Sequence, residues 1–274
     1  MEEKWEVSTK TIIGVSNLML CNLDEIYETL PLEEIKTVYY KSGWRGDHAM
    51  TTRAFRMKNK AFRNAINIIM ETPRDENKRI NIKMSKNGKF QMTGCKHDDD
   101  AMEILKKVIT ILIRDCKQHV RIVESGEVRV YMQTVMTNID FKMDFCIDRQ
   151  KLDDVIRDEP SYHSLLETSF GYTGVNIKIP VSNDWVELPV PVLRTLDGEA
   201  WNTEFIPLKN LTSDINLSKR RYNTFLVFHS GNIIMSGMRK ETMTEDYRSF
   251  LVFLQKKKHD IKEVIESYTN ECLQ

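Results

Sequence analysis

The sequence has 274 residues, 41% of them hydrophobic, and its 40 basic residues balance its 40 acidic residues. This length fits one large domain or two of ordinary size with a substantial core, and the composition argues against bulk disorder. A net charge of zero is unusual for a protein that binds nucleic acid non-specifically, because such proteins normally carry a basic surplus. The charge is uneven along the chain, however, since residues 53–96 hold twelve Lys or Arg against three acids.

The cysteines and histidines give no sign of a metal site. The five cysteines are scattered without a Cys-x-x-Cys pair, and the six histidines form no pair at metal-ligand spacing. This pattern argues against a zinc site and against a disulfide framework, so we expect neither a metal nor another cofactor. The chain begins without an apolar signal region, and it has no apolar run long enough to span a bilayer. We therefore expect a soluble, intracellular protein with no membrane partner.

The first half of the chain predicts a strand, a helix, three further strands and a long helix. Residues 7–20 are rich in β-branched and apolar residues, as in a strand. Residues 22–30 predict a short helix with Asn22 as its cap and Pro31 as its stop. The later elements are predicted strands at 62–70, 79–84 and 89–93, and a helix whose apolar stripe runs from Met102 to Ile113.

The second half repeats this plan. Residues 128–145 alternate between apolar and polar side chains with the period of a strand. A helix follows from Asp148 to Asp158, again stopped by a proline, Pro160. Strands are predicted at 172–180, 223–228 and 232–236, and a closing helix has its apolar stripe between Tyr247 and Ile265.

A short phrase occurs in both halves, 143 positions apart. Its first copy runs from Gly88 to Lys96 and its second from Gly231 to Arg239. The shared positions are Gly88 with Gly231, Met92 with Met235, Thr93 with Ser236, Gly94 with Gly237, and Lys96 with Arg239. Internal duplication of this kind can decide the architecture. We predict two repeats, residues 1–127 with an insertion near 31–60 and residues 128–274 with an insertion near 181–221.

The order of these segments, with a Gly-x-x-x-x-Thr/Ser-Gly hairpin in each half, resembles the TATA-box-binding protein family. The clearest passage is 223–239, and residues 137–144 are similar to the first strand of the family's second repeat. The large insertions resemble the forms encoded by large double-stranded DNA viruses. The resemblance implies an α+β fold, in which two pseudo-symmetric repeats form a curved antiparallel sheet, or saddle, with helices on its convex face.

The resemblance also implies which residues contact DNA. Side chains that insert between base steps match Phe228 and Tyr172 in the second half and Phe62 in the first, where the remaining place falls on Met84 or Ser85. Positions that hydrogen-bond in the groove match Asn138, Thr11, Thr93 and Ser236. Cations that face the phosphates match Lys89, Lys96 and Arg239. The resemblance implies no catalytic residue and no metal ligand.

The function that this resemblance implies is transcription initiation. The protein would bind and bend A·T-rich promoter DNA through the minor groove and recruit a partner resembling transcription factor IIB and an RNA polymerase. It would act as a monomer or in a hetero-complex, in the nucleus or at a cytoplasmic viral replication site, or be packaged in the virion. The alternative is a protein–protein scaffold with little DNA binding of its own. An enzyme is a third class, which the absence of a phosphate-binding loop and of a metal-spaced pair in the sequence disfavours.

Overall fold

The structure is a computed structural model. It describes residues 5–41, 43–47, 64–124, 126–166, 174–211 and 220–263, with the side chains of residues 76 and 77 left aside. The chain divides into two compact units. The N-terminal unit comprises residues 7–137 together with 183–217, and the C-terminal unit comprises residues 1–6, 138–182 and 218–274. Each unit is described by itself.

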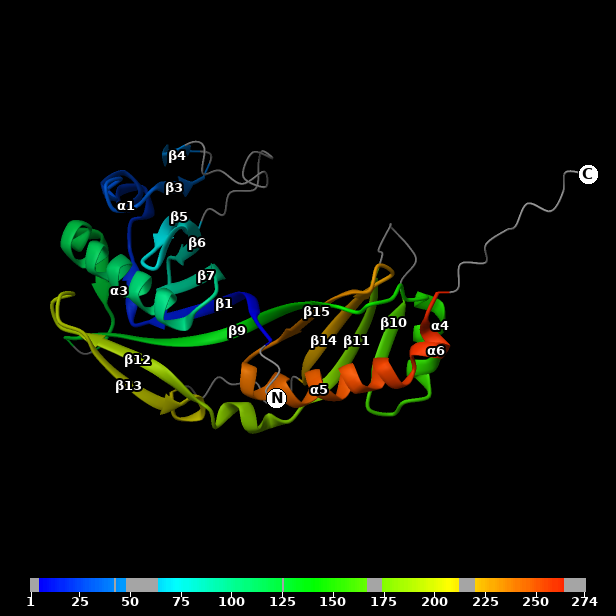
Figure 1. The fold of residues 1–274 in the computed structure, drawn as a ribbon. Coiled ribbons are helices and arrows are strands. Elements are labelled where there is room, and N and C mark those ends of the chain that lie inside the picture. The colour runs from blue at the N-terminus through cyan, green and yellow to red at the C-terminus, as the bar shows by residue number, and fades with distance from the viewer. Residues whose placement is uncertain are drawn as a thin grey trace, which may run out of the picture. The chain divides into compact units, whose positions relative to one another are not determined.

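The N-terminal unit is an antiparallel sheet that carries its helices on one face (Figure 1). The strands lie in the order β1-β7-β6-β5-β3, so the first strand of the chain pairs with the last strand before the long helix. In chain order its main elements are β1 (Val7–Ser16), α1 (Leu23–Thr29), β3 (Thr37–Tyr40), β5 (Ala65–Thr72), β6 (Asp75–Ser85), β7 (Lys89–Cys95) and α3 (Asp98–Asp115).

The C-terminal unit has the same element order and the same strand order, β9-β15-β14-β11-β10. Its elements are β9 (Val128–Lys142), α4 (Arg149–Arg157), β10 (His163–Leu166), β11 (Gly174–Val181), β14 (Arg221–Phe228), β15 (Asn232–Gly237) and α5 (Lys240–Lys256). Element for element, β9 corresponds to β1, β15 to β7, β14 to β6 and α5 to α3. The predicted α+β class with two repeated antiparallel units is therefore confirmed.

Shorter elements lie outside this shared plan. A two-stranded sheet joins β2 and β8, β4 pairs with β3, and β12 and β13 form a hairpin. Their bounds are β2 (Leu18–Leu20), β4 (Gly43–Gly46), β8 (Val120–Ile122), β12 (Pro189–Thr195), β13 (Asn202–Pro207) and α6 (Lys258–Ile261), with 3-10 turns η2 (Lys117–His119), η4 (Asn183–Val186) and η5 (Leu208–Asn210).

The insertion of the second repeat packs with the first. Strand β12 pairs with the beginning of β9, where Val192 lies opposite Tyr131 and Thr195 opposite Val128. Arg194 of the hairpin lies 2.7 Å from a carboxylate oxygen of Glu127. The compact units therefore differ from the predicted ranges 1–127 and 128–274. The reason is that β9 continues through residues of both units, and its early part offers a free edge to the inserted hairpin.

The predicted helix caps are present. The side chain of Asn22 accepts a hydrogen bond from the backbone N–H of Glu25 at 3.3 Å. Asp148 accepts from the backbone N–H groups of Gln150 and Lys151 at 3.0 and 3.1 Å. Such caps satisfy N–H groups that have no partner within the helix. The predicted closing helix is divided into α5, which ends at Lys256, and the short α6, and the last residues of its predicted stripe, Val264 and Ile265, lie outside the described residues.

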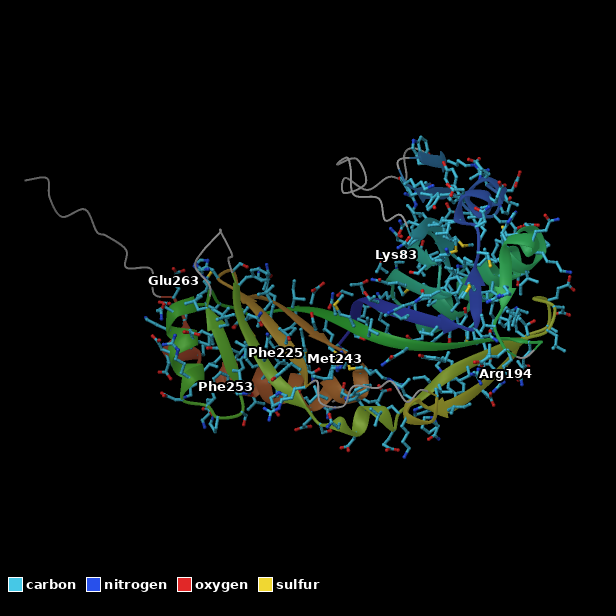
Figure 2. The ribbon with its side chains drawn as sticks, turned by 180° about the vertical axis from the view of Figure 1, so that it is seen from behind. Lys83, Arg194, Phe225, Met243, Phe253 and Glu263 are labelled. Carbon is cyan, nitrogen blue, oxygen red and sulfur yellow. The ribbon has the colours of Figure 1, made fainter. Side chains whose placement is uncertain are left out.

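Each sheet buries every second side chain against its own helices. In the C-terminal unit the ring of Phe225 stacks on Phe250 of α5 with centroids 4.0 Å apart, and Met243 of α5 is fully buried nearby (Figure 2). In the N-terminal unit Ile82 and Phe90 of the sheet and Leu105 of α3 are fully buried in one cluster. Because successive side chains of a strand point to opposite faces, this burial leaves one face of each sheet without helices.

The two glycines that begin the repeated phrase form matching hairpin turns. Gly88 has φ +72° and Gly231 has φ +78°, and each donates its N–H to the carbonyl three residues earlier at 3.0 Å. A Cβ atom on Gly88 would lie 2.1 Å from the carbonyl oxygen of Leu18, and one on Gly231 would lie 2.5 Å from that of Phe145. Only glycine fits such a position, which explains the two copies of the phrase.

Replacing Gly231 with alanine is expected to destabilise the protein. The left-handed backbone alone costs about 1–2 kcal/mol for a residue with a Cβ atom, and the contact with Phe145 adds to this. Urea unfolding measures the change. Gly126→Ala is the matched control, because a Cβ atom there meets nothing within 4 Å. Equal stabilities of the two variants would contradict this account of the turn.

Candidate nucleic-acid interface

The candidate interface is the sheet face that the helices leave uncovered, which we call the open face of each unit. Its residues follow from the pairing register, because residues directly opposite each other in an antiparallel pair point to the same side. In the C-terminal unit Phe225, Val227, Ile233 and Met235 point to the helices and are buried. Their neighbours along β14 and β15 therefore lie on the open face, where Asn232 is exposed and the others are half-buried.

The first row across the C-terminal open face is polar. Ser236 lies opposite Thr224, Thr224 opposite Lys178, and Lys178 opposite His163. The hydroxyl of Ser236 donates a hydrogen bond to Oδ1 of Asn138 on β9 at 2.8 Å. Asn138 and Ser236, both predicted as groove contacts, are thus neighbours on the open face.

The second row of the same face is largely apolar. Ile234 lies opposite Leu226, Leu226 opposite Asn176, and Asn176 opposite Leu165, whose side chain is 57% exposed. Sequence reasoning missed Ile234, Leu226 and Leu165 as site residues. The signal was available for the first two, since each lies two positions from a residue that was predicted, Ser236 and Phe228.

Phe228 lies at the end of the apolar part of this face. It is half-buried at the end of β14 and lies opposite Gly174 on β11. A Cβ atom on Gly174 would lie 2.5 Å from Cδ1 of Leu226 and 3.5 Å from Cε1 of Phe228. The two side chains therefore lie over the glycine backbone, which leaves room for them on the open face.

The N-terminal open face has the same rows with different chemistry. Its first row holds Thr11, Thr93, Asn81, Ile69 and Thr37, paired in that order. Its second row holds Ile13, Gln91, Lys83, Asn67 and Tyr39. Val15 lies opposite Lys89, and Ser85 opposite Ala65. None of these residues is acidic, and beyond them on the same face Glu71 lies opposite Arg79, so Lys83 and Lys89 leave the face basic (Figure 2 labels Lys83). Thr11, Ile69 and Thr37 of the first row are buried.

The remaining predicted cations lie beside the hairpins. Lys89 is exposed at the start of β7. Lys96 lies between β7 and α3, and Arg239 lies at the matching place between β15 and α5. Arg239 is 3.6 Å from a carboxylate oxygen of Glu241. Phe62 and Tyr172, two of the predicted wedges, lie outside the described residues.

The structure corrects the interpretation of Met84. Its side chain is fully buried in the N-terminal core and points to the helices, so it is not available to a ligand on the open face. The register explains why. Asn81 pairs with Thr93 as Thr224 pairs with Ser236, so Ser85, four residues after Asn81, is the counterpart of Phe228. The two turns have equal length, and there is no extra turn residue to move Met84 into this place.

The same register shifts the alignment of the middle strands. Ala65 lies opposite Ser85 and Gly174 lies opposite Phe228. The pairing thus aligns Ala65 with Gly174, an offset of 174 − 65 = 109 positions between the two repeats. The sequence match of Phe62 with Tyr172 uses an offset of 110, which is one residue more. A shift of one residue moves a side chain to the other face of a sheet.

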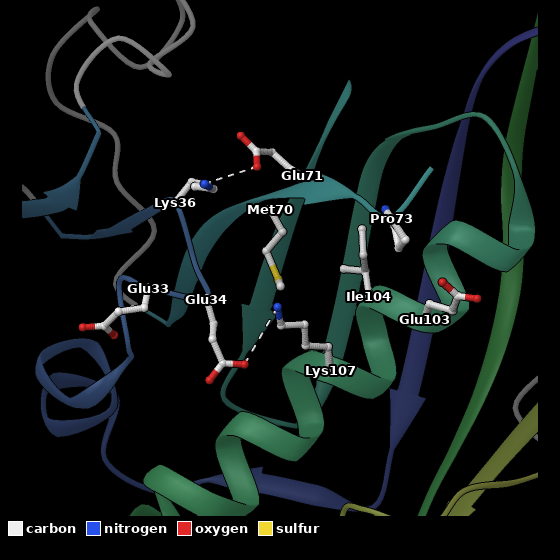
Figure 3. Close-up of a pocket in the computed structure, with 9 residues that line it drawn as sticks. All are labelled: Glu33, Glu34, Lys36, Met70, Glu71, Pro73, Glu103, Ile104 and Lys107. Atoms are coloured by element: carbon white, nitrogen blue, oxygen red, sulfur yellow. Dashed lines mark ion pairs between the residues drawn. The ribbon is translucent and has the colours of Figure 1, made fainter. Parts of the chain in front are cut away.

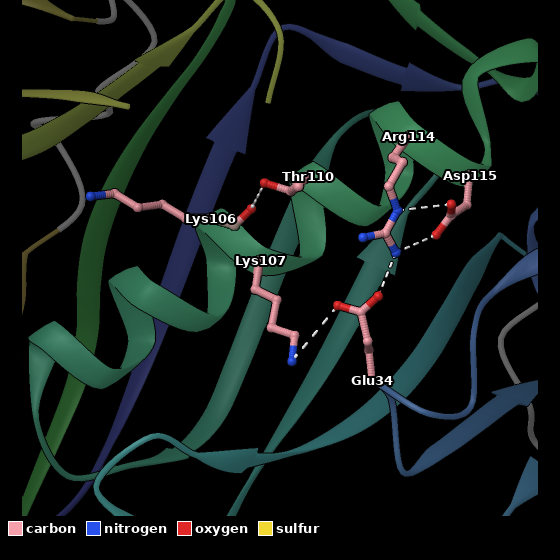
Figure 4. Close-up of polar contacts among 6 residues, drawn as sticks. All are labelled: Glu34, Lys106, Lys107, Thr110, Arg114 and Asp115. Atoms are coloured by element: carbon pink, nitrogen blue, oxygen red, sulfur yellow. Dashed lines mark hydrogen bonds and ion pairs between the residues drawn. The ribbon is translucent and has the colours of Figure 1, made fainter. Parts of the chain in front are cut away.

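A pocket of about 500 Å³ lies on the helix side of the N-terminal unit, away from the open face. Nζ of Lys36 is 3.2 Å from Oε2 of Glu71, and Nζ of Lys107 is 3.8 Å from Oε2 of Glu34 (Figure 3). Glu34 also pairs with Arg114, which bonds Asp115 at 2.7 Å and lowers the pKa of that carboxyl (Figure 4). The lining residues are Glu33, Glu34, Lys36, Met70, Glu71, Pro73, Glu103, Ile104 and Lys107.

Within the part of the chain that the structure describes, no group of three or more His, Cys, Asp or Glu side chains could hold a metal ion. Among the same residues, no helix is long and apolar enough to cross a membrane.

Alanine variants of Met84 and Ser85 test which of these two side chains lies in the core and which on the open face. We expect Met84→Ala to lower the free energy of unfolding by about 2–5 kcal/mol, the usual cost of removing a buried methionine side chain. The adjacent Ser85→Ala should change it by less than about 0.5 kcal/mol, because its side chain lies on the open face. Urea unfolding of both variants measures this. A small effect of Met84→Ala would restore Met84 as an open-face residue.

No protein-family model matches the chain. It is similar to a "TATA-box-binding protein-like" protein of Acanthamoeba polyphaga mimivirus, with 32% identity over 158 residues, which cover 53% of this chain and 42% of that protein. It is also similar to protein 335L of Invertebrate iridescent virus 6, with 24% identity over 212 residues that cover 73% of this chain. The chain spans 42% and 62% of the lengths of these two relatives.

The comparison with solved structures finds the TBP of Methanococcus jannaschii. The match covers 92% of this chain and 98% of that chain, with a TM-score of 0.45 and 11% sequence identity. The similarity to the mimivirus protein confirms the resemblance to TATA-box-binding proteins that the repeated hairpins predict.

Proposed function

We propose that the protein is a TATA-binding-protein-like transcription initiation factor that binds A·T-rich promoter DNA in the minor groove and bends it. The observation that carries the proposal is the C-terminal open face. Ile234, Leu226 and Phe228 form an apolar strip there, beside the hydrogen-bonded pair Asn138 and Ser236. A contiguous apolar surface on an otherwise polar face indicates a binding site.

The minor groove suits this surface. Its floor presents the acceptors of adenine and thymine and few other groups, so shape and apolar contact dominate recognition there. Proteins that bind this groove commonly insert apolar side chains between base steps and bend the duplex. Phe228 supplies such a side chain, and the amide of Asn138 supplies a donor to the groove acceptors. The basic N-terminal open face supplies attraction to the phosphates.

On this proposal the bent DNA is then bound by a partner resembling transcription factor IIB and by an RNA polymerase. This step follows from the resemblance of the repeated hairpins to the TATA-box-binding protein family. The helix sides of both units remain available for protein contacts while the open faces hold DNA. The whole function requires no covalent chemistry by the protein.

Removing the Phe228 ring tests the proposal. We expect Phe228→Ala to weaken binding to an A·T-rich duplex about tenfold or more, since stacking of an aromatic ring on a base contributes about 1–3 kcal/mol. Gel shift measures the affinity, and energy transfer between dyes at the duplex ends measures the bend. Val252→Ala is the control, because Val252 is 67% exposed on α5. No binding and no bending of any A·T-rich duplex would refute the proposal.

Lys89 is expected to contribute through phosphate neutralisation. Loss of one phosphate contact should reduce the slope of log affinity against log salt by about 0.9. Anisotropy titrations of Lys89→Ala at several salt concentrations measure this slope. Lys106→Ala is the matched control, because Lys106 lies on α3 at the helix side (Figure 4). An unchanged slope for Lys89→Ala would place Lys89 outside the contact.

The N-terminal open face favours one alternative, a protein–protein scaffold with little DNA binding of its own. Ser85 replaces the ring that Phe228 provides, and Lys83 lies where the C-terminal face has Leu226. The Phe228→Ala variant also decides this point. If promoter-dependent transcription in vitro survives that change while Glu103→Lys at the helix-side pocket removes a co-purifying partner, the scaffold is the better account.

A further inference from the structure

The hairpin of β12 and β13 belongs to the N-terminal unit and lies outside the rows of its open face (Figure 1). It is held in place by polar contacts as well as by its pairing with β9. Arg194 lies 2.7 Å from a carboxylate oxygen of Glu127 and 2.6 Å from one of Glu204. Trp201 donates its indole N–H to the carbonyl of Gly198 at 3.1 Å. A surface that is ordered in this way before a partner arrives loses little conformational entropy on binding.

The prolines of this hairpin determine where the backbone groups of β13 point. Opposed residues in an antiparallel pair alternate between pairs that exchange two hydrogen bonds and pairs that exchange none. Pro189 lies opposite Pro207, and proline has no N–H to exchange. Pro191 lies opposite Phe205, which is therefore also in a pair without exchanged bonds. Thr203 is two residues from Phe205 and is of the same kind. Both residues direct their N–H and carbonyl groups away from β12.

These backbone groups form the outer edge of β13. In the described part of the chain β13 pairs with β12 alone, so no strand there bonds to Thr203 or Phe205 on this edge. The side chain of Phe205 is 67% exposed, and Pro191 opposite it is half-buried. An accessible strand edge beside an exposed apolar side chain is a template for pairing with another chain.

The segment that carries this edge is acidic. Residues 183–211 hold five acidic and two basic residues, a net charge of 2 − 5 = −3. Both of these cations are already paired with glutamates. Asp197 and Glu199 are exposed in the turn that leads into β13. A surface of this charge repels the phosphates of DNA and attracts a basic segment of a protein.

We propose that β13 is a docking edge for a partner protein, which adds an extended, basic strand to the hairpin. The backbone of the partner bonds to Thr203 and Phe205. Its apolar side chains, at alternate positions, cover the ring of Phe205 and Pro191, and its lysine or arginine lies near Asp197 and Glu199. In strand addition of this kind the main-chain hydrogen bonds give affinity and the alternate side chains give specificity. The inference goes beyond the proposed function and does not depend on DNA binding.

Amide hydrogen exchange, followed by NMR on the full chain, tests the proposal. The probe is a synthetic peptide in which valine alternates with threonine and which ends in two lysines. Without peptide, the amides of Thr203 and Phe205 are expected to exchange about tenfold or more faster than those of Glu204 and Ile206, which bond to β12. Saturating peptide should slow the exchange of Thr203 and Phe205 about tenfold or more, and leave Glu204 and Ile206 little changed.

Two variants test the edge and the ring separately. Thr203→Pro removes an outward N–H group, and Phe205→Ala removes the exposed ring. Each should weaken peptide binding about fivefold or more in fluorescence anisotropy. Leu196→Ala is the matched control, because Leu196 is 76% exposed but lies outside β13. The midpoint of urea unfolding should be the same in all three variants, because none of them removes a bond between β12 and β13. A peptide that ends in two glutamates should bind more weakly than the lysine peptide.

Four results would overturn the inference. Slow exchange of Thr203 and Phe205 without peptide, at every protein concentration, means that the edge is covered within the chain. Protection that rises with protein concentration means that a second copy occupies it. The third result is millimolar peptide that leaves both amides unprotected, and the fourth is equal binding of the lysine and glutamate peptides or of Phe205→Ala and the unmodified chain. No DNA enters this experiment, so its failure is distinguishable from failure of the proposed function.

Discussion

The pairing register of two hairpins decides what the protein can present to a ligand. In each hairpin the register depends on a turn of the same length, closed by a glycine with positive φ, Gly88 or Gly231. Because side chains alternate between the faces of a strand, a slip of one residue would exchange Phe228 with Val227 and move the core to the open side. The turn therefore controls both the stability of each unit and the composition of its candidate site.

Sequence patterns predicted the elements that alternate or cap in a regular way. The helix caps Asn22 and Asp148, the strands of both hairpins and the duplication itself follow from local signals. The side-chain face of Met84 does not, because Met84 and Ser85 are adjacent and only the pairing with β7 separates them. The short strands β3 and β10 were missed because four residues are too few to show a period. The packing of hairpin β12–β13 was not predictable either. It requires β12 to pair with the beginning of β9, a strand far away in the sequence.

The zero net charge hides a separation of charge within the N-terminal unit. The three rows of its open face hold Lys83 and Lys89 and no acid, and beyond them Glu71 lies opposite Arg79. On the helix side Glu34 and Asp115 are paired with lysine or arginine. Exposed pairs of this kind contribute little to stability, typically about 0–1 kcal/mol. Their larger effect is on the surface potential, because they neutralise the helix side and leave the open face as a basic surface of this unit. A composition that disfavours non-specific binding is thus compatible with a basic binding face.

A duplicated fold does not require duplicated chemistry. The backbone of both units needs the glycine turns and the apolar alternation on the covered face, and both copies retain them. Folding constrains the open face less, since most of its side chains, apart from the buried Thr11, Thr37, Ala65 and Ile69, are accessible to solvent or a ligand. Lys83 opposite Gln91, where the other copy has Leu226 opposite Ile234, is therefore a difference that stability alone does not explain. An exposed apolar strip such as Leu226, Ile234 and Phe228 lowers solubility, so a surface that only met solvent would not favour it. Its presence argues that the C-terminal unit makes the specific contact with a ligand.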